Sequence, residues 1–173
     1  ILNWYDLNKR SLPWRCKVSY QKRQYYTLVS EFMLQQTQVA TVIPYFNQFI
    51  KNIPTLDDLA KVQNTKLIKL WEGLGYYSRA RNLRKTAQIL KKNFKGKLPD
   101  NFEDLKSLPG IGNYTASAIL AIAFNKQYIP LDGNIERVLK RYLYLRKNNE
   151  IQKEYLQNKK SIFGVSKRSS DYA

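Results

Sequence analysis

The sequence has 173 residues, 43% of them hydrophobic, which is enough to fold around a core and excludes a disordered basic tail. The 30 lysines and arginines outnumber the 13 acidic residues and give a formal net charge of +17, which attracts polyanions, although an AT-rich coding sequence would enrich lysine too. The sequence has no histidine and one cysteine, Cys16, which excludes Ser–His and Cys–His nucleophile pairs, histidine-ligated zinc and a disulfide framework.

The apolar residues recur at helical spacing along most of the chain. This spacing appears at residues 28–46, 56–71 (a pair of short helices), 80–94, 102–108, 114–124 and 135–143. Gln35 interrupts the first stripe, and Pro44 should end or bend that helix. Alternating strand patterns are scarce, and no apolar run is long enough to cross a bilayer. We therefore expect an all-α fold.

The strongest local motif is Leu-Pro-Gly-Ile-Gly at residues 108–112, between two predicted helices. Gly110 and Gly112 let the backbone approach a phosphate closely, and the N–H groups that open the next helix favour an anion. A plain helical corner is the alternative. The complete string in a basic all-α chain favours phosphate binding, which positions DNA without reading its sequence.

Two aromatic clusters have open interpretations. At residues 73–77, tyrosines follow a glycine turn and precede a basic helix that includes Arg79 and Arg81. This tip fits an aromatic wedge pushed into a base stack, and equally a solvated helix with tyrosines that cap the core. Near the start, Trp14 and Arg15 could stack on a base, but the position alone favours a tryptophan that anchors the N-terminal segment.

Two carboxylates are candidates for catalysis. Glu31 is the one charged residue between Arg23 and Lys51, so desolvation would raise its pKa and make it a general acid. From position alone, however, Glu31 is better explained as a carboxylate at the rim with its head in water, and Asp132, just before a predicted helix, has helix capping as a strong alternative. Cleavage of an N-glycosidic bond needs a proton donor and a nearby negative charge, which two such groups would supply.

Together these strings closely resemble the MutY-type, A/G-specific adenine DNA glycosylases of the helix-hairpin-helix (endonuclease III) superfamily. The matching strings are LPWR at 12–15, SEFMLQQTQV at 30–39, VIPYF at 42–46, GLGYYSRARNL at 73–83, LPGIG at 108–112 and LDGN at 131–134. The resemblance implies an all-α helix-hairpin-helix glycosylase core, with two helical subdomains flanking a DNA-binding cleft. The implied reaction is hydrolysis of the bond to adenine mispaired with 8-oxoguanine or guanine.

The resemblance also implies roles for individual residues. The catalytic set is Glu31 as the acid, Asp132 as the charge at the sugar, Asn134 to orient Asp132, and Tyr114 beside the sugar. The expected adenine pocket is Arg10, Trp14, Arg15 and Leu34, and the expected DNA contacts are Gln36, Leu74, Tyr76, Gly110, Gly112 and Thr115. Strand-cleaving relatives carry a lysine where this chain has Tyr114, so we expect base removal without strand cleavage.

We expect an N-terminal segment (1–23), a central helical domain (24–137) with the hairpin motif at 105–118, and the truncated start of a second subdomain (138–173). A 4Fe-4S cluster is expected in the full-length protein, on cysteines beyond Ala173, with no metal bound by this chain. The expected partner is duplex DNA, bound by a monomer that is cytoplasmic and nucleoid-associated if bacterial. The stretch from Cys16 to Tyr26 exceeds the family pattern, which suggests a different loop before the Glu31 helix. The rivals are a bifunctional pyrimidine glycosylase and lyase of the same superfamily and a non-catalytic DNA-binding module.

Overall fold

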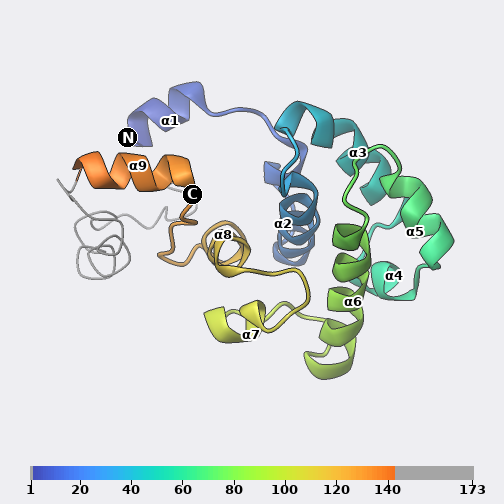
Figure 1. Ribbon diagram of the computed structural model, residues 1–173. Helices are drawn as coiled ribbons and strands as arrows, with labels where there is room; N and C mark the ends of the chain where they lie inside the picture. Colours follow the sequence, from blue (N-terminus) through green and yellow to red (C-terminus); the bar gives the residue numbers. More distant parts are fainter. Residues whose placement is uncertain (1, 143–173) are drawn as a thin grey trace.

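The computed structural model describes residues 2–142, which form α-helices and a short 3₁₀ helix, with no strand in that range (Figure 1). The elements are α1 (Leu2–Asn8), η1 (Pro13–Arg15), α2 (Tyr20–Leu34), α3 (Val39–Asn52), α4 (Leu56–Lys61), α5 (Asn64–Trp71), α6 (Ser78–Asn93), α7 (Phe102–Lys106), α8 (Asn113–Phe124) and α9 (Gly133–Tyr142). The all-α prediction is confirmed. No helix in the described part of the chain has the length and apolar character needed to cross a membrane.

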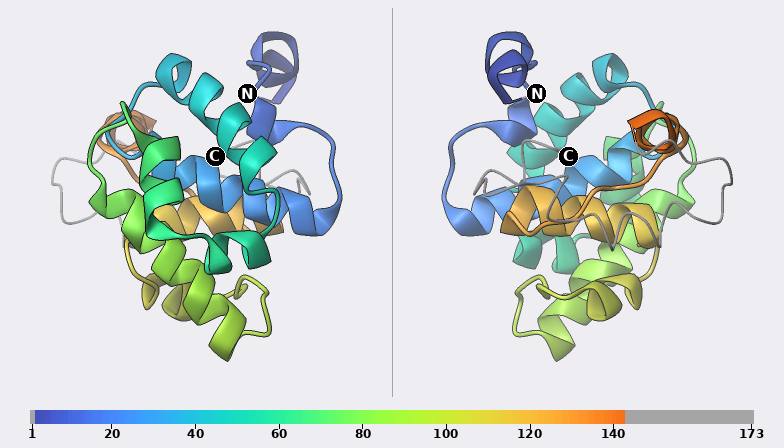
Figure 2. Two further views of the ribbon diagram at one scale, coloured as in Figure 1. Left: turned by 90° about the vertical axis from the view of Figure 1, so that its right-hand side faces the viewer. Right: turned by 90° about the vertical axis from the view of Figure 1, so that its left-hand side faces the viewer.

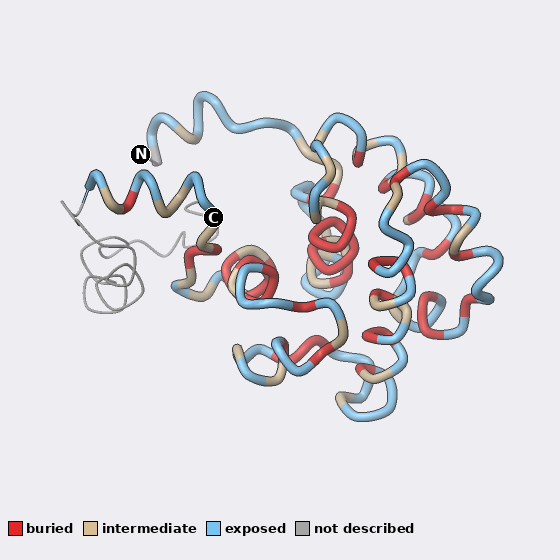
Figure 3. Tube along the Cα trace, in the orientation of Figure 1, coloured by how far each residue is buried: buried red, intermediate tan, exposed pale blue. Residues whose placement is uncertain are grey.

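Helix α2 is the centre of the fold. Helices η1, α3, α6 and α8 pack against it, and the two views of Figure 2 show α3 to α6 on one side and α8 on the other. Every residue from Thr27 to Met33 is buried, so this half of α2 is enclosed on all sides (Figure 3). The carboxyl group of Glu31 is therefore carried into the core by the helix that bears it.

The stripe expected over residues 28–46 is two helices rather than one. Helix α2 ends at Leu34, and α3 begins at Val39 after a turn in which Gln36 has a left-handed φ of +57°. Pro44 does not end α3 but lies inside it. The short turn between Leu34 and Val39 leaves the apolar residues on its two sides at helical spacing, so the spacing alone predicted one helix.

The segment before Glu31 is helical from Tyr20 onward. The residues from Tyr20 to Tyr26 form about the first two turns of α2, since an α-helix has about 3.6 residues per turn. The hydroxyl oxygen of Ser19 accepts a hydrogen bond from the backbone N–H of Lys22 and caps this end. The loop before the Glu31 helix is therefore confined to residues that precede Tyr20, and its difference from the family pattern stays a prediction.

The hairpin between α7 and α8 needs glycine at residue 110. Gly110 has a φ of +80°, and a Cβ atom there would lie 2.8 Å from the ring of Phe32 and 2.9 Å from Cβ of Asn82. This close approach seats the hairpin directly on α2 and α6.

The chain ends of the described region are less enclosed. Helix α1 is exposed along most of its length, including Trp4 and Leu7 (Figure 3). The expected second subdomain falls on 138–173, of which the structure describes only the end of α9, and residues 143–173 lie outside the described residues. The boundaries at residues 23 and 137 stay predictions.

Candidate active site

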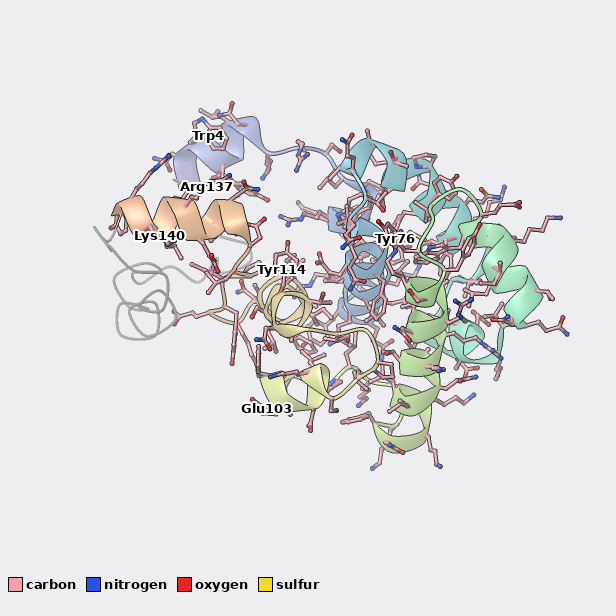
Figure 4. The ribbon with its side chains drawn as sticks, in the orientation of Figure 1. Trp4, Tyr76, Glu103, Tyr114, Arg137 and Lys140 are labelled. Carbon is pink, nitrogen blue, oxygen red and sulfur yellow. The ribbon has the colours of Figure 1, made fainter. Side chains whose placement is uncertain are left out.

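A cavity of about 670 Å³ lies where the end of α2, the turns before α6 and α9, and the start of α8 converge. This volume falls within the roughly 300–1,000 Å³ that is typical of ligand sites. Glu31, Asp132 and Tyr114 all line it. The other lining residues are Leu34, Gln35, Gln36, Tyr76, Ser78, Arg79, Gly112 and Thr115. In Figure 4, Tyr114 and Tyr76 come from the two sides of α2.

Glu31 is a buried acid. Its side chain and backbone are only 8% exposed, which contradicts the rim alternative considered from the sequence. Desolvation by the surrounding core raises the pKa of Glu31 to about 7, and the positive charge of Arg15 opposes that rise. Near neutral pH the carboxyl group is therefore present in both its protonated and its ionised form.

Asp132 lines the same cavity and also caps a helix. Its Oδ1 accepts hydrogen bonds from the backbone N–H groups of Asn134 at 2.9 Å and Ile135 at 2.8 Å. The capping role and the cavity position coexist, because a helix N-terminus both satisfies a carboxylate and favours its negative charge. The cap fixes where this carboxylate points.

The phenol of Tyr114 is affected by the charges of both acids. It lies in the first turn of α8, and burial followed by the charges of Glu31 and Asp132 raises its pKa to about 12. The phenol therefore stays protonated at physiological pH and can donate a hydrogen bond inside the cavity. That both carboxylates act on one hydroxyl indicates that all three groups share one electrostatic environment.

Asn134 reaches Asp132 through its backbone. Its N–H group donates to the carboxylate, whereas its side-chain oxygen accepts a hydrogen bond from Arg137. The orientation that we expected from the side chain of Asn134 is thus provided by the main chain of α9, and the role of the side chain stays a prediction.

The expected adenine pocket is divided between two cavities. Leu34 lines the cavity described above, whereas Arg10, Trp14 and Arg15 line a second one of about 430 Å³. Trp14 is 4% exposed, and its ring packs edge-on against Phe46 with a centroid separation of 5.3 Å. The anchoring role is therefore what the structure shows for this tryptophan.

The second cavity is strongly basic. Its lining contains four cationic side chains, those of Lys9, Arg10, Arg15 and Arg23, and no acid. The charge of Arg15 acts on both Glu31 and Tyr114, so this cavity and the carboxylate cavity are electrostatically coupled.

The expected DNA contacts also separate into two groups. Gln36 and Tyr76 line the carboxylate cavity, and Tyr76 is 63% exposed. Leu74 is 6% exposed and belongs to the core. Gly112 and Thr115 reach the cavity from the start of α8, and the side chain of Thr115 is buried.

Sequence reasoning missed two polar residues that join these segments. Gln35 donates from Nε2 to the carbonyl of Gly110 at 3.1 Å and to the hydroxyl of Thr115 at 3.4 Å. Arg79, which the sequence suggested as part of a DNA-facing basic helix, is 6% exposed and donates to backbone carbonyls. Arg79 lies four residues before Leu83 and thus on the apolar face of α6, a helical spacing that separates it from the exposed Arg81 and that sequence reasoning did not use.

The described residues do not fit an iron–sulfur cluster. Within residues 2–142, no three side chains of the acidic, cysteine or histidine type lie close enough together to hold a metal ion. A 4Fe-4S cluster takes four thiolates, and the sequence has Cys16 alone.

Comparison with known families and proteins places the site in context. The family model for "HhH-GPD superfamily base excision DNA repair protein" matches residues 29–162, from the buried half of α2 through the hairpin and Asp132. The adenine DNA glycosylase of Buchnera aphidicola subsp. Baizongia pistaciae is 50% identical over 151 residues, which cover 87% of this chain and 42% of that protein. The human adenine DNA glycosylase is 47% identical over 144 residues, which cover 80% of this chain and 26% of that protein. The chain thus spans less than half the length of these curated relatives.

A solved structure supports the same fold. A thermostable thymine-DNA glycosylase superposes with a TM-score of 0.82 at 24% sequence identity, over 99% of this chain and 79% of that one. At this identity the likeness establishes the architecture and not the substrate. The predicted helix-hairpin-helix glycosylase fold is confirmed.

Proposed function

The chain belongs to the HhH-GPD superfamily of base excision DNA repair proteins, and from this premise we propose that it forms the catalytic core of a monofunctional DNA glycosylase that removes adenine mispaired with 8-oxoguanine or guanine. The observation that carries the proposal is the pair of carboxylates, Glu31 and Asp132, in one cavity with different surroundings. Glu31 is desolvated, whereas Asp132 is held by two backbone N–H groups. Such a pair suits an acid and a charge stabiliser.

The reaction divides between these groups. The target nucleotide must first leave the stack, because its glycosidic bond is inaccessible within a duplex. Glu31 gives its proton to a ring nitrogen of adenine, and the electrons of the breaking C–N bond stay with the departing base. Asp132 stabilises the positive charge that develops on the sugar carbon, and water then adds there and gives its proton to the ionised Glu31, which restores the acid. General acid catalysis alone is worth about 10²–10⁴-fold, so both carboxylates are needed.

Phosphate contacts come from the hairpin. The first turn of α8 has backbone N–H groups with no intrahelical acceptor, and it begins at the wall of the cavity. A net charge of +17 attracts the duplex over a longer range. Phosphates bound at this turn would hold the strand beside Glu31 and Asp132, with the protein acting as a monomer.

Base removal without strand cleavage follows from the lining of the cavity. Strand cleavage through a Schiff base requires an amine within reach of the sugar. No lysine lines the carboxylate cavity in the described part of the chain, and Tyr114 occupies the first turn of α8. The rest of the longer protein would supply the second helical subdomain, its iron–sulfur cluster and the recognition of oxidised guanine.

A single-turnover assay on duplex DNA tests the proposal. The full-length protein should release adenine placed opposite 8-oxoguanine or guanine, and Glu31→Gln should slow the release by at least about 10²-fold. Glu103→Gln, which changes an exposed acid on α7, is the matched control and should leave the rate unchanged. Equal rates for Glu31→Gln and the unsubstituted protein would show that Glu31 is not the acid.

A further inference from the structure

Arg79 ties together the two turns that line the carboxylate cavity opposite the hairpin. Its Nη1 lies within hydrogen-bonding distance of the carbonyls of Met33 at 2.8 Å and Gln35 and of the Thr37 hydroxyl at 3.1 Å. Its Nη2 donates to the carbonyls of Leu74 at 3.0 Å and Gly75 at 3.1 Å. One planar guanidinium thus bonds to two segments about 40 residues apart in the sequence.

These contacts compensate for the end of α2. The carbonyls of Phe32 and Met33 are among the last four of the helix, which have no intrahelical donor. Arg79 donates to both, and a positive charge at a helix C-terminus is favourable. Glu31 directly precedes Phe32, so the same contacts fix the part of the helix that bears the acid.

The two turns that Arg79 contacts each contain one residue with a left-handed backbone conformation. Gln36 has a φ of +57° and Tyr76 a φ of +48°, a conformation that side-chain-bearing residues rarely adopt. Arg79 holds the carbonyl just before each of them, at Gln35 and Gly75. The guanidinium carbon also lies 5.5 Å from the centre of the Tyr76 ring, in cation–π contact. The side chains of Gln36 and Tyr76, which have this backbone conformation, both line the cavity.

We propose that Arg79 is a positioning residue that holds Gln36 and Tyr76 in their left-handed conformations and thereby sets how well the protein distinguishes an adenine mispair from a matched pair. The inference rests on the function proposed above. Arg79 acts through the two turns that carry these side chains, to whose carbonyls its guanidinium is bonded. A residue that merely stabilises the fold would affect all DNA substrates alike.

The test compares substitutions at two arginines of one helix in the full-length protein. Arg79→Met removes the clamp, and Arg79→Lys keeps a charge that cannot bond to both turns as a planar fork does. Arg81→Met removes the same charge from an exposed position of α6. The measured quantity is the ratio of affinities for a mispaired and a matched duplex, together with the fluorescence of 2-aminopurine placed beside the target adenine.

Both Arg79 substitutions should lower the affinity ratio by about tenfold, the size of a typical coupling between contacting residues. The fluorescence rise that reports base unstacking should fall with it. Arg81→Met should weaken binding to both duplexes equally and leave the ratio unchanged. If Arg79→Met does not fold, Arg79→Lys provides the same comparison.

A double-mutant cycle shows whether Arg79 acts through its neighbours. In a protein that already carries Gln36→Ala and Tyr76→Ala, Arg79→Met should change the ratio by less than about twofold, because the side chains it positions are gone. An undiminished effect in that background, or an unchanged ratio in the Arg79 variants, overturns the inference. If the unsubstituted protein itself neither prefers the mispair nor removes adenine, the proposed function fails, and this inference fails with it.

Discussion

Replacing Glu31 by glutamine should stabilise the folded protein at alkaline pH and leave its stability in acid nearly unchanged. Glutamine has the shape of a protonated glutamate but cannot ionise, so the substitution removes only the cost of a buried charge. The carboxyl group is enclosed by α2 and its neighbours, and burial raises its pKa from the usual 4.5 to about 7. The ionised form of Glu31, the group proposed as the proton donor, therefore destabilises the folded protein.

The magnitude follows from the two pKa values. Below pH 4.5, Glu31 is protonated in both the folded and the unfolded chain and contributes no difference. Between that pH and about 7, the folded chain keeps the proton that the unfolded chain releases, so the free energy of unfolding falls as the pH rises. At about 1.4 kcal/mol per pH unit, the loss reaches about 3 kcal/mol by about pH 8.

Urea denaturation at a series of pH values measures this effect. The unsubstituted protein and Glu31→Gln should have similar free energies of unfolding near pH 4.5, and the variant should be more stable by about 3 kcal/mol near pH 8. Glu103→Gln controls for the loss of an exposed acid and should show no such divergence. A constant difference between Glu31→Gln and the unsubstituted protein across this range would refute a raised pKa at Glu31.

Three further changes test the site and its supports. Arg15→Met removes a charge that lowers the pKa of Glu31, so the pH at which adenine release falls by half should move upward in a single-turnover pH profile, and a downward shift would contradict the coupling. Gly110→Ala should lower the free energy of unfolding by about 1–3 kcal/mol in urea denaturation, because its φ is positive and its Cβ would clash, whereas Gly112→Ala, which meets no atom, should change it by less than about 1 kcal/mol. Trp14→Ala should cost about 3–5 kcal/mol in the same experiment if the indole is a core anchor, and a loss below about 1 kcal/mol would exclude that role.

The sequence was most informative where a residue type contradicts its surroundings. Glu31 is an isolated charge in an apolar stretch, and burial of that stretch predicted its raised pKa before its neighbours were known. The Leu-Pro-Gly-Ile-Gly string predicted the hairpin turn, because few residues other than glycine adopt the positive φ of residue 110. In both cases the residue type suggests a local property, but the surrounding strings were needed to favour it over a rim carboxylate or a plain helical corner.

The sequence was least informative where distant segments meet. Six oxygen atoms from residues 32–37 and 74–75 lie within hydrogen-bonding distance of Arg79, and only the fold brings them to one guanidinium. The position of Trp14 favours an anchor, but the partner of that anchor, Phe46, becomes known only in the fold. A pattern along the chain cannot report such contacts, because their sequence separation carries no periodic signal.

The break between α2 and α3 is what creates a site at all. Helix α2 is buried on every side up to Met33, so a helix that continued to residue 46 would enclose Glu31 completely. Because the helix ends at Leu34 and the chain turns at Gln36, the cavity opens within one helical turn of the acid. At the end of α2 the carbonyls of Phe32 and Met33 lack donors within the helix, and Arg79 donates hydrogen bonds to them. In this fold, Glu31 is buried and still lines a cavity because α2 ends at Leu34, and the buried guanidinium of Arg79 stabilises that helix end.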